Sequence, residues 1–264
     1  MIFNLNHEEQ LAIRNQETID FFEQNNLFET LMKNKSFNND KENYFISHLI
    51  DKALQTYQKN IKLSKVLNYA ITKLEKTDFI TEHEPNITSE IIWQGVGKTL
   101  GEFTQWLSKF VKQLTGFNKL NQDDLLTIIS AAIFFCFGSH INCFFDKEYN
   151  ECYMIISNNI QISKSRLLQI FSPDLVDPIF KFHSLFRDLN LTETEIALWY
   201  PLIICNCNPD VIKDKENFLK IKNIYTKCFL YTFDMNKRDT IFYQKLSDLF
   251  NVCAILDSKK EKLG

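Results

Sequence analysis

The sequence predicts an all-α domain whose helices pack in three layers. Of its 264 residues, 45% are hydrophobic and 24 are phenylalanine, whereas only 6 are glycine and 5 are proline. This composition is typical of a packed helical domain, and the length is ample for a single core. The segment Leu125–Phe145 is apolar on nearly every side. A helix of that kind lies either in a membrane or in the middle layer of a helical protein.

The middle-layer interpretation is favoured over a membrane span. Polar residues such as Ser130 and His140 interrupt the apolar run, and Asp123 and Asp146 flank it without a basic cluster. A membrane span of this length is normally uninterrupted and carries lysine or arginine on its cytoplasmic side. We therefore expect a three-layer helical sandwich with Leu125–Phe145 in its middle layer, and no membrane association.

The chain divides into a polar extension and a domain. Residues 1–42 are rich in Asn, Gln, Lys and Glu, and we expect a loosely held extension with one or two short helices there. Residues 43–264 form the predicted domain. Apolar residues at helical spacing predict its first packed helix over Tyr44–Tyr57 and a second amphipathic piece over Lys62–Lys76.

A long helix is predicted over Ser89–Thr115, after a polar connection. At 1.5 Å per residue it would be about 40 Å long, enough to run along one whole side of the domain. Gly116 favours the end of this helix because it adopts a left-handed conformation without a Cβ penalty. Lys112 lies in the last turn, where a cation stabilises the exposed carbonyl groups.

The next helix is predicted to start with a capping box. Asn121 is the expected N-cap and Asp124 its partner three residues later, with Leu120 and Leu125 as the hydrophobic staple around them. The two adjacent carboxylates, Asp123 and Asp124, are therefore explained by the electrostatics of a helix start rather than by catalysis.

After Phe145 the character of the chain changes. Residues 146–151 are typical of a turn, and Cys152–Ile156 is typical of a short strand. The following helix is predicted to begin at Asp177 and Pro178, since proline is tolerated at a first helical position.

A second capping box joins Thr192 and Glu195 and opens a buried helix over residues 196–207. Pro201 is expected to bend this helix, and Pro209 follows its end. The last two long helices are predicted over Lys220–Phe233 and Asp239–Leu256.

No constellation of catalytic residues is visible. The five histidines form no HExxH motif, no serine lies in a GxSxG elbow, and neither GxGxxG nor a phosphate-binding loop is present. His183 lies on an apolar helix face and is interpreted as a structural histidine. The chain is therefore not expected to be an enzyme.

The seven cysteines are scattered through apolar runs, a pattern of reduced, buried thiols in an intracellular protein. Cys205 and Cys207 lack a second pair, so no zinc site is expected. The beginning of the chain has no signal-peptide pattern. A net charge of −3 gives no general reason to bind nucleic acid.

Three segments together resemble a known family. They are Phe110–Leu126 (FVKQLTGFNKLNQDDLL), Glu90–Gln94 with its tryptophan, and Ile179–Phe182 continuing to Leu189–Trp199 (LNLTETEIALW). They resemble, in order and spacing, the ligand-binding domains of nuclear receptors, and are most similar to the retinoic-acid-related orphan receptors and the Rev-erb-like receptors. The resemblance covers about residues 44–260. It implies an antiparallel three-layer helical sandwich with a small two-stranded hairpin.

The resemblance also implies a pocket for a small lipophilic ligand, sterol-like or fatty. Its lining would comprise Val96, Leu100, Phe103, Phe134, Phe137, His140, Ile141, Val176 and Ile179. The alternative is that these residues fill the core, because protein interiors pack densely and Phe103 and Phe137 are large for their positions. His140 stands where related receptors often carry an arginine for a ligand carboxylate, so an acidic ligand is not expected.

A coregulator groove is the second implied site, at Val111, Lys112, Leu126, Ile129 and Ser130. Lys112 matches the lysine that holds one end of a coactivator helix, although a capping role also explains it. The segment after Leu256 shows no activation helix with the matching glutamate. Corepressor peptides are therefore expected to bind better than coactivator peptides.

Other family features are absent from the sequence. The position of the haem-binding histidine of Rev-erb-like receptors falls at or near Leu256, so haem is not expected. No Cys₄ zinc modules are visible, hence no DNA-binding domain and no direct contact with nucleic acid are expected. Two functions stay open: a ligand-responsive regulator of transcription in the nucleus, also present in the cytoplasm, or a ligand-independent antagonist that forms homodimers or heterodimers with other nuclear receptors.

Overall fold

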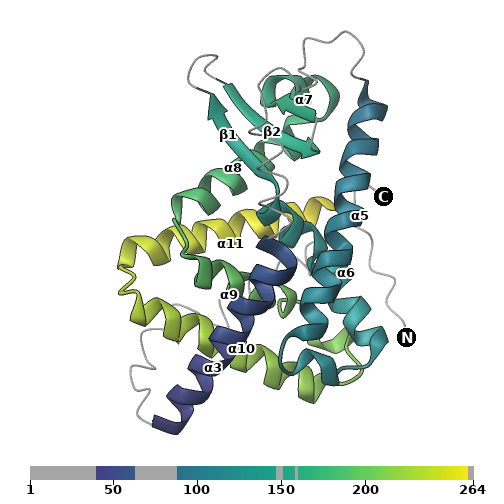
Figure 1. The fold of residues 1–264 in the computed structure, drawn as a ribbon. Coiled ribbons are helices and arrows are strands. Elements are labelled where there is room, and N and C mark those ends of the chain that lie inside the picture. Colours follow the sequence, from purple (N-terminus) through teal and green to yellow (C-terminus); the bar gives the residue numbers. More distant parts are fainter. Residues whose placement is uncertain (1–39, 63–87, 147–150, 158–159, 261–264) are drawn as a thin grey trace, which may run out of the picture.

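The computed structural model describes residues 40–62, 88–146, 151–157 and 160–260, and it confirms the all-α sandwich (Figure 1). The predicted extension over residues 1–42 and the piece Lys62–Lys76 lie almost entirely outside the described residues. The helices are α3 (Asp40–Tyr57), a π-helical turn η1 (Gln58–Lys62), α5 (Ser89–Gln113), a 3₁₀ turn η2 (Phe117–Lys119), α6 (Gln122–His140), α7 (Lys164–Ile170), α8 (Pro173–Asp188), α9 (Glu193–Ile204), a 3₁₀ turn η3 (Pro209–Val211), α10 (Lys215–Met235) and α11 (Thr240–Lys260). The strands are β1 (Asn142–Asp146), β2 (Glu151–Ser157) and β3 (Ile160–Ser163).

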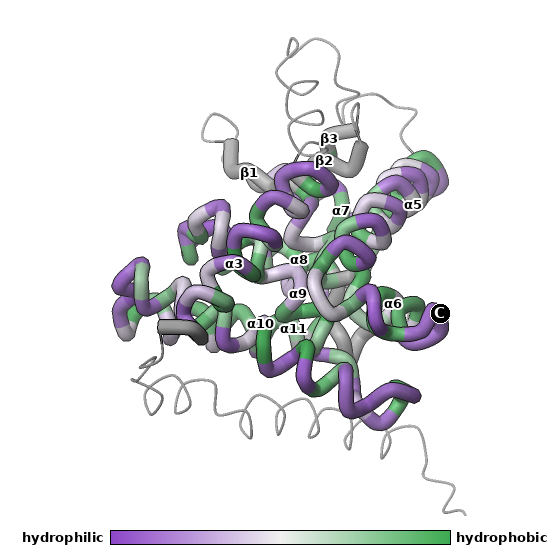
Figure 2. Tube along the Cα trace, turned by 60° about the horizontal axis from the view of Figure 1, so that its bottom comes forward, coloured by the Kyte–Doolittle hydropathy of each residue, from purple (hydrophilic) through white to green (hydrophobic). Residues whose placement is uncertain are grey.

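Helices α6 and α9 form the middle layer. Helix α9 contacts α3, α6 and α10, and α6 also contacts α5 and α8. Both central helices are apolar on most sides, and residues 197–200 of α9 are 0% exposed. The indole Nε1 of Trp199 donates a hydrogen bond of 2.7 Å to Ser139 Oγ, which ties the two helices together. Hydrophobic stretches of the chain face inward and hydrophilic stretches outward (Figure 2).

The long helix α5 ends at Gln113, two residues before its predicted end, because Leu114 is already extended; Gly116 lies at the start of η2 and does not end the helix itself. Gly116 has a φ of +94°, a conformation that disfavours any side chain. A Cβ added there would also lie 3.0 Å from Ile221 Cγ1 on α10. The corner between α5 and α6 therefore depends on glycine both for its backbone conformation and for the close approach of α10.

The central helix is shorter than predicted. It was expected to run to Phe145, but α6 ends at His140 and Ile141 is already extended. Residues 142–146 instead form β1, which pairs antiparallel with β2 from Asn142 opposite Ile155 to Asp146 opposite Glu151. Aromatic residues suit a strand as well as a helix, so apolar character alone did not mark this boundary.

The predicted strand Cys152–Ile156 lies within β2 and forms the expected hairpin with β1. The sheet also contains β3, which pairs antiparallel with the other side of β2 and shifts register between Ile155 and Ser157. Ser163 at the end of β3 caps α7, because its Oγ accepts a hydrogen bond from Arg166 N. The third strand therefore leads directly into α7.

Helix α8 starts earlier than predicted. Its first residue is Pro173, after the N-cap Ser172, and Pro178 lies inside the helix rather than at its start. The N–H that Pro178 lacks would have bonded to the carbonyl of Asp174 in the first turn. Asp174 lies in the first turn and is exposed to water, so the loss of this one helical hydrogen bond costs little.

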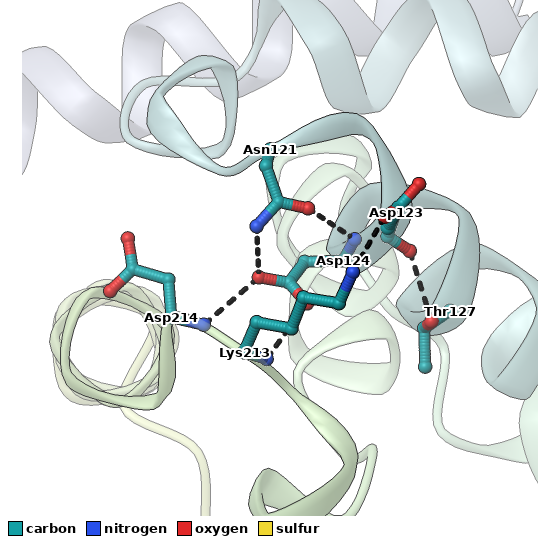
Figure 3. Close-up of polar contacts among 6 residues, drawn as sticks. All are labelled: Asn121, Asp123, Asp124, Thr127, Lys213 and Asp214. Carbon is teal, nitrogen blue, oxygen red and sulfur yellow. Dashed lines mark hydrogen bonds and ion pairs between the residues drawn. The ribbon is translucent and has the colours of Figure 1, made fainter.

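The corner before α6 contains a network around Asp124 (Figure 3). As expected, Asn121 is the N-cap, and its Oδ1 accepts a hydrogen bond of 2.9 Å from Asp124 N. The carboxylate of Asp124 does not turn back to the N-cap backbone as a capping box requires. It accepts from Asn121 Nδ2 at 2.8 Å and from the backbone N–H groups of Lys213 and Asp214 at 2.8 and 3.0 Å.

This network holds Asp124 in its charged form. Its side chain is 1% exposed, and burial alone raises the pKa of the carboxyl group. The hydrogen bonds from Lys213 N, Asp214 N and Asn121, together with the charge of Lys213, outweigh burial and hold the pKa of Asp124 below its ordinary value. The carboxylate therefore fastens the start of α6 to the segment before α10.

Replacing Asp124 with asparagine is expected to lower the free energy of unfolding by about 1–3 kcal/mol, because its amide nitrogen cannot accept a hydrogen bond and would face the backbone N–H of either Lys213 or Asp214. Urea denaturation at neutral pH measures the loss. The matched control is Asp123→Asn, which removes only the exposed ion pair with Lys213 Nζ and should change stability by less than about 1 kcal/mol. Equal losses in the two variants would contradict the role given to Asp124.

The stability difference between the Asp124→Asn variant and the natural protein should narrow in acid. A carboxyl group whose folded-state pKa is lowered contributes stability above its ordinary pKa of 3.8, and the contribution is lost as pH falls through the lower folded-state value. The variant carries an amide at this position, which does not titrate, so it has no such contribution to lose.

The capping box of α9 is confirmed and has a further role. Glu195 Oε2 accepts a hydrogen bond of 2.7 Å from Thr192 N, and Thr192 Oγ1 accepts one from Glu195 N. The same carboxylate forms a bidentate ion pair with Arg238, which lies between α10 and α11. Glu195 is 0% exposed, so this ion pair fixes the α10–α11 connection to the start of a middle-layer helix.

Candidate ligand cavity and coregulator surface

An apolar cavity of about 140 Å³ lies between the main core and a smaller hydrophobic cluster. The smaller cluster contains residues of α5, β2, β3, α7 and α8, such as Ile92, Met154 and Val176. The cavity is lined by Ile92, Trp93, Val96, Phe135, Phe137, Gly138, Ile141, Met154, Leu167, Phe171, Val176, Ile179, Phe180, Phe182, His183 and Leu256. Its position follows from the fold, because the sheet and α7 cover one side of α5 and α8 without filling the space between them.

Five of the predicted pocket residues line this cavity: Val96, Phe137, Ile141, Val176 and Ile179. They come from α5, α6, the end of α6 and α8, which are distant in sequence. The structure therefore brings together side chains that the sequence could associate only through the family resemblance.

Three other predicted residues lie elsewhere. Phe103 is 0% exposed in the main core, with its ring centroid 4.7 Å from that of His140 and 5.7 Å from that of Phe137. Leu100 packs against the same core. His140 is buried among aromatic rings, including Trp106 at 5.9 Å. The side chain of Phe134 lies outside the described part of the chain.

The sequence reasoning missed much of the lining. Ile92 and Trp93 lie one turn before Val96 on α5, so helical spacing pointed to them. Met154 on β2 and Leu256 on α11 had no such signal, because only the packing of the sheet and of α11 places them at the cavity. His183, interpreted as structural, also lines it.

Two aromatic side chains lie at the outer side of the cavity. Trp93 is 50% exposed, and its ring meets that of Phe171 edge-on, at 5.2 Å between centroids and 85° between planes. Both residues line the cavity and have water on their other side. A contact between two partly exposed rings separates the cavity from solvent at this point.

The predicted coregulator residues lie at the end of α5 and in the first turns of α6, joined by the corner of residues 114–121. Lys112 and Ser130 are exposed, and Leu126 is 55% exposed. Val111 and Ile129 are buried beneath them. We call these five residues the coregulator surface.

Five cysteines of the described residues are buried. Cys136, Cys205, Cys207, Cys228 and Cys253 form no disulfide, and burial raises the pKa of Cys228 to about 12. In the described ranges, no three His, Cys, Asp or Glu side chains lie close enough to hold a metal ion. Among the described helices, none combines the length and the apolar character that crossing a membrane requires.

The helix order, the small sheet and this cavity agree with what the resemblance to nuclear receptor ligand-binding domains implies. Sequence comparison supports the same class. The chain is 27% identical over 132 residues to ecdysone-induced protein 75B, isoforms C/D, of Drosophila melanogaster, covering 49% of the chain and 11% of that protein. It is 26% identical to the ecdysone-inducible protein E75 of Galleria mellonella, over 49% of the chain and 18% of that protein.

A third relative is the probable nuclear hormone receptor HR3 of Drosophila melanogaster, 24% identical over 50% of the chain and 29% of that protein. No family model matches the chain. The chain thus spans less than a third of each of these relatives. The resemblance to nuclear receptors of the Rev-erb-like group is confirmed over about half of the chain, and so is the expectation that it is not an enzyme.

Proposed function

We propose that this domain regulates transcription in the nucleus by binding a small lipophilic ligand in the cavity and coregulator helices on the coregulator surface. The cavity is the observation that carries the ligand part of the proposal. Its lining is almost entirely hydrophobic, and it lies between α5, α6, α8, α11 and the sheet. A site of this kind binds ligands through burial of apolar surface.

The size of the cavity restricts the ligand. Drug-sized ligands occupy pockets of roughly 300–1,000 Å³, whereas an apolar cavity of about 150 Å³ accommodates a molecule such as benzene. At about 140 Å³ the cavity favours a thin alkyl chain that enters end-on over a rigid sterol. Haem is not expected, because Leu256 stands at the position of the haem-binding histidine of Rev-erb-like receptors and a macrocycle exceeds this volume.

Native mass spectrometry of the full chain, followed by thermal unfolding with added n-alkyl alcohols or cholesterol, tests this proposal. A ligand at 100 times its Kd should stabilise the protein by about 2.7 kcal/mol, and the alcohols are expected to act more strongly than cholesterol. Val176→Phe should abolish the effect by filling the cavity. Val252→Ala is the control, because Val252 is equally buried, at 2% exposure, but lies in the main core.

An alternative function is a ligand-independent antagonist that dimerises with other receptors. The packing of Phe103 against Phe137 favours it, because these rings occupy space that a larger pocket would need. Protein that carries no co-purified molecule and shows no thermal shift with any alkyl compound would support this alternative and contradict the ligand proposal.

The coregulator surface is proposed to prefer corepressor helices. Lys112 can hold the carbonyl groups at the C-terminal end of a peptide helix, and the exposed Leu126 offers apolar contact for its leucines. Fluorescence titration should show tighter binding of a long corepressor peptide than of a short LxxLL peptide. Lys112→Ala should weaken both, whereas Lys98→Ala, an exposed lysine earlier on α5, should weaken neither. Tighter binding of the short peptide would refute the preference.

A further inference from the structure

The segment Leu27–Met32, LFETLM, has the residue spacing that the coregulator surface is proposed to bind. It places Phe28, Leu31 and Met32 at positions i, i+3 and i+4, which share one face of a helix. An amphipathic helix with apolar residues at this spacing is the kind of partner that an exposed leucine beside a lysine accommodates. The segment lies outside the described residues, eight residues before α3.

Charge also favours binding of the segment Leu27–Met32 to the coregulator surface. The corner that carries the coregulator surface has exposed lysines at positions 109, 112 and 119. Residues 17–36 contain four acidic side chains, at positions 17, 20, 23 and 29, and two basic ones, at positions 33 and 35, so this stretch carries a net charge of −2. The nearby carboxylate of Asp123 is paired with Lys213 Nζ at 2.7 Å, so it does not offset the lysines. An acidic segment is therefore attracted to this face.

The reach of the chain decides which copy supplies the segment. Helix α3 begins at Asp40 and continues into η1, where Asn60 Nδ2 donates to Gln113 Oε1 of α5 at 3.3 Å. Twenty helical residues separate Asp40 from Asn60, about 30 Å. Figure 1 shows α3 starting on the side of the molecule away from α5 and α6. The eight residues from Met32 to Asp40 span at most about 28 Å when fully extended, which is less than the helical length from Asp40 to Asn60, so a second copy is the better source of the segment.

We propose that residues 27–32 of one copy of this chain bind the coregulator surface of a second copy. The partner is thus another molecule of the same protein, and reciprocal exchange would fill both surfaces in a dimer. The inference rests on the proposed coregulator function and deepens it, because the segment would compete with coregulator peptides. Self-association and coregulator binding would then exclude each other.

Sedimentation of the full chain over a range of concentrations tests the inference with two complementary variants. Phe28→Ala/Leu31→Ala removes the segment's anchors but leaves the surface intact. Leu126→Asp disables the surface but leaves the segment intact, and the 55% exposure of Leu126 makes the change tolerable for folding. Each variant alone should associate on the order of tenfold more weakly than the natural chain. Mixing the two should restore association, because one intact surface then meets one intact segment.

Several results would overturn the inference. Association unchanged in both variants would place the contact elsewhere. A natural chain that is monomeric at all concentrations would also overturn the inference. If the chain is monomeric and the Phe28→Ala/Leu31→Ala variant binds peptides better than the natural chain does, the segment binds the surface of its own chain, and the inference is likewise wrong.

A labelled peptide of residues 22–36, titrated onto the Phe28→Ala/Leu31→Ala variant, separates this inference from the proposed function. Binding of this peptide, weakened by Lys112→Ala, is the expected result. If corepressor or LxxLL peptides bind but this peptide does not, the inference alone fails. If none of them binds, the coregulator surface itself is refuted.

Discussion

Replacing Arg238 with methionine is expected to lower the free energy of unfolding by about 3–5 kcal/mol, because it leaves the carboxylate of Glu195 buried without a countercharge. Glu195 is 0% exposed, and the Arg238 side chain is 17% exposed. The guanidinium also donates to Asn190 O at 3.0 Å and lies 4.5 Å from the Phe242 ring centroid. Urea denaturation at pH 7 measures the loss.

The matched control is Arg187→Met. Arg187 lies 3.5 Å from Asp188, and both side chains are about half exposed, so the change should cost less than about 1 kcal/mol. A similar small loss for Arg238→Met would show that water compensates Glu195 and that the pair does not hold the α10–α11 connection in place.

The difference in stability between the natural protein and Arg238→Met should change with pH in a definite direction. Burial alone raises the pKa of Glu195, but the hydrogen bonds from Arg238, Asn236 and Thr192 outweigh it and hold the pKa below its ordinary value. The pair therefore contributes stability above the ordinary pKa of 4.5, and the contribution is lost as pH falls through the lower folded-state value. The natural protein and Arg238→Met should converge in acid.

Replacing Phe103 with alanine should also destabilise the domain by about 3–5 kcal/mol and leave an apolar void. Phe103 is 0% exposed and its ring lies near those of Phe137, His140 and Tyr200. It does not line the cavity, so a ligand cannot shift into the vacated space. Thermal and chemical unfolding should give the same loss before and after extraction with an organic solvent.

Trp93→Ala is the comparison for Phe103→Ala. Trp93 lines the cavity and is half exposed, so its truncation should cost less, and the cost should depend on whether a ligand is present. A loss for Phe103→Ala that shrinks when ligand is bound would show instead that the cavity extends to Phe103.

The sequence by itself determined the all-α fold, the central position of the helix after the corner, and the starts of α5, α6, α9 and α11; α3, α8 and α10 start four or five residues earlier than predicted, and α7 was not predicted. These features depend on local chemistry. Gly116 forms the corner after α5 because of its own backbone freedom, and the side chains of Asn121 and Thr192 cap the helices that follow them. Signals contained within a few residues can be read without knowing what packs against them.

The tertiary structure alone decided where helices give way to strands and which side chains share a space. Asn142–Phe145 became a strand because β2 was available to pair with it. Phe103 lies in the core rather than at the cavity because the rings of His140 and Tyr200 surround it. Asp124 accepts a hydrogen bond from Asp214, 90 residues away in sequence, and Glu195 accepts one from Arg238, 43 residues away. Such contacts depend on long-range packing, which a local residue pattern does not encode.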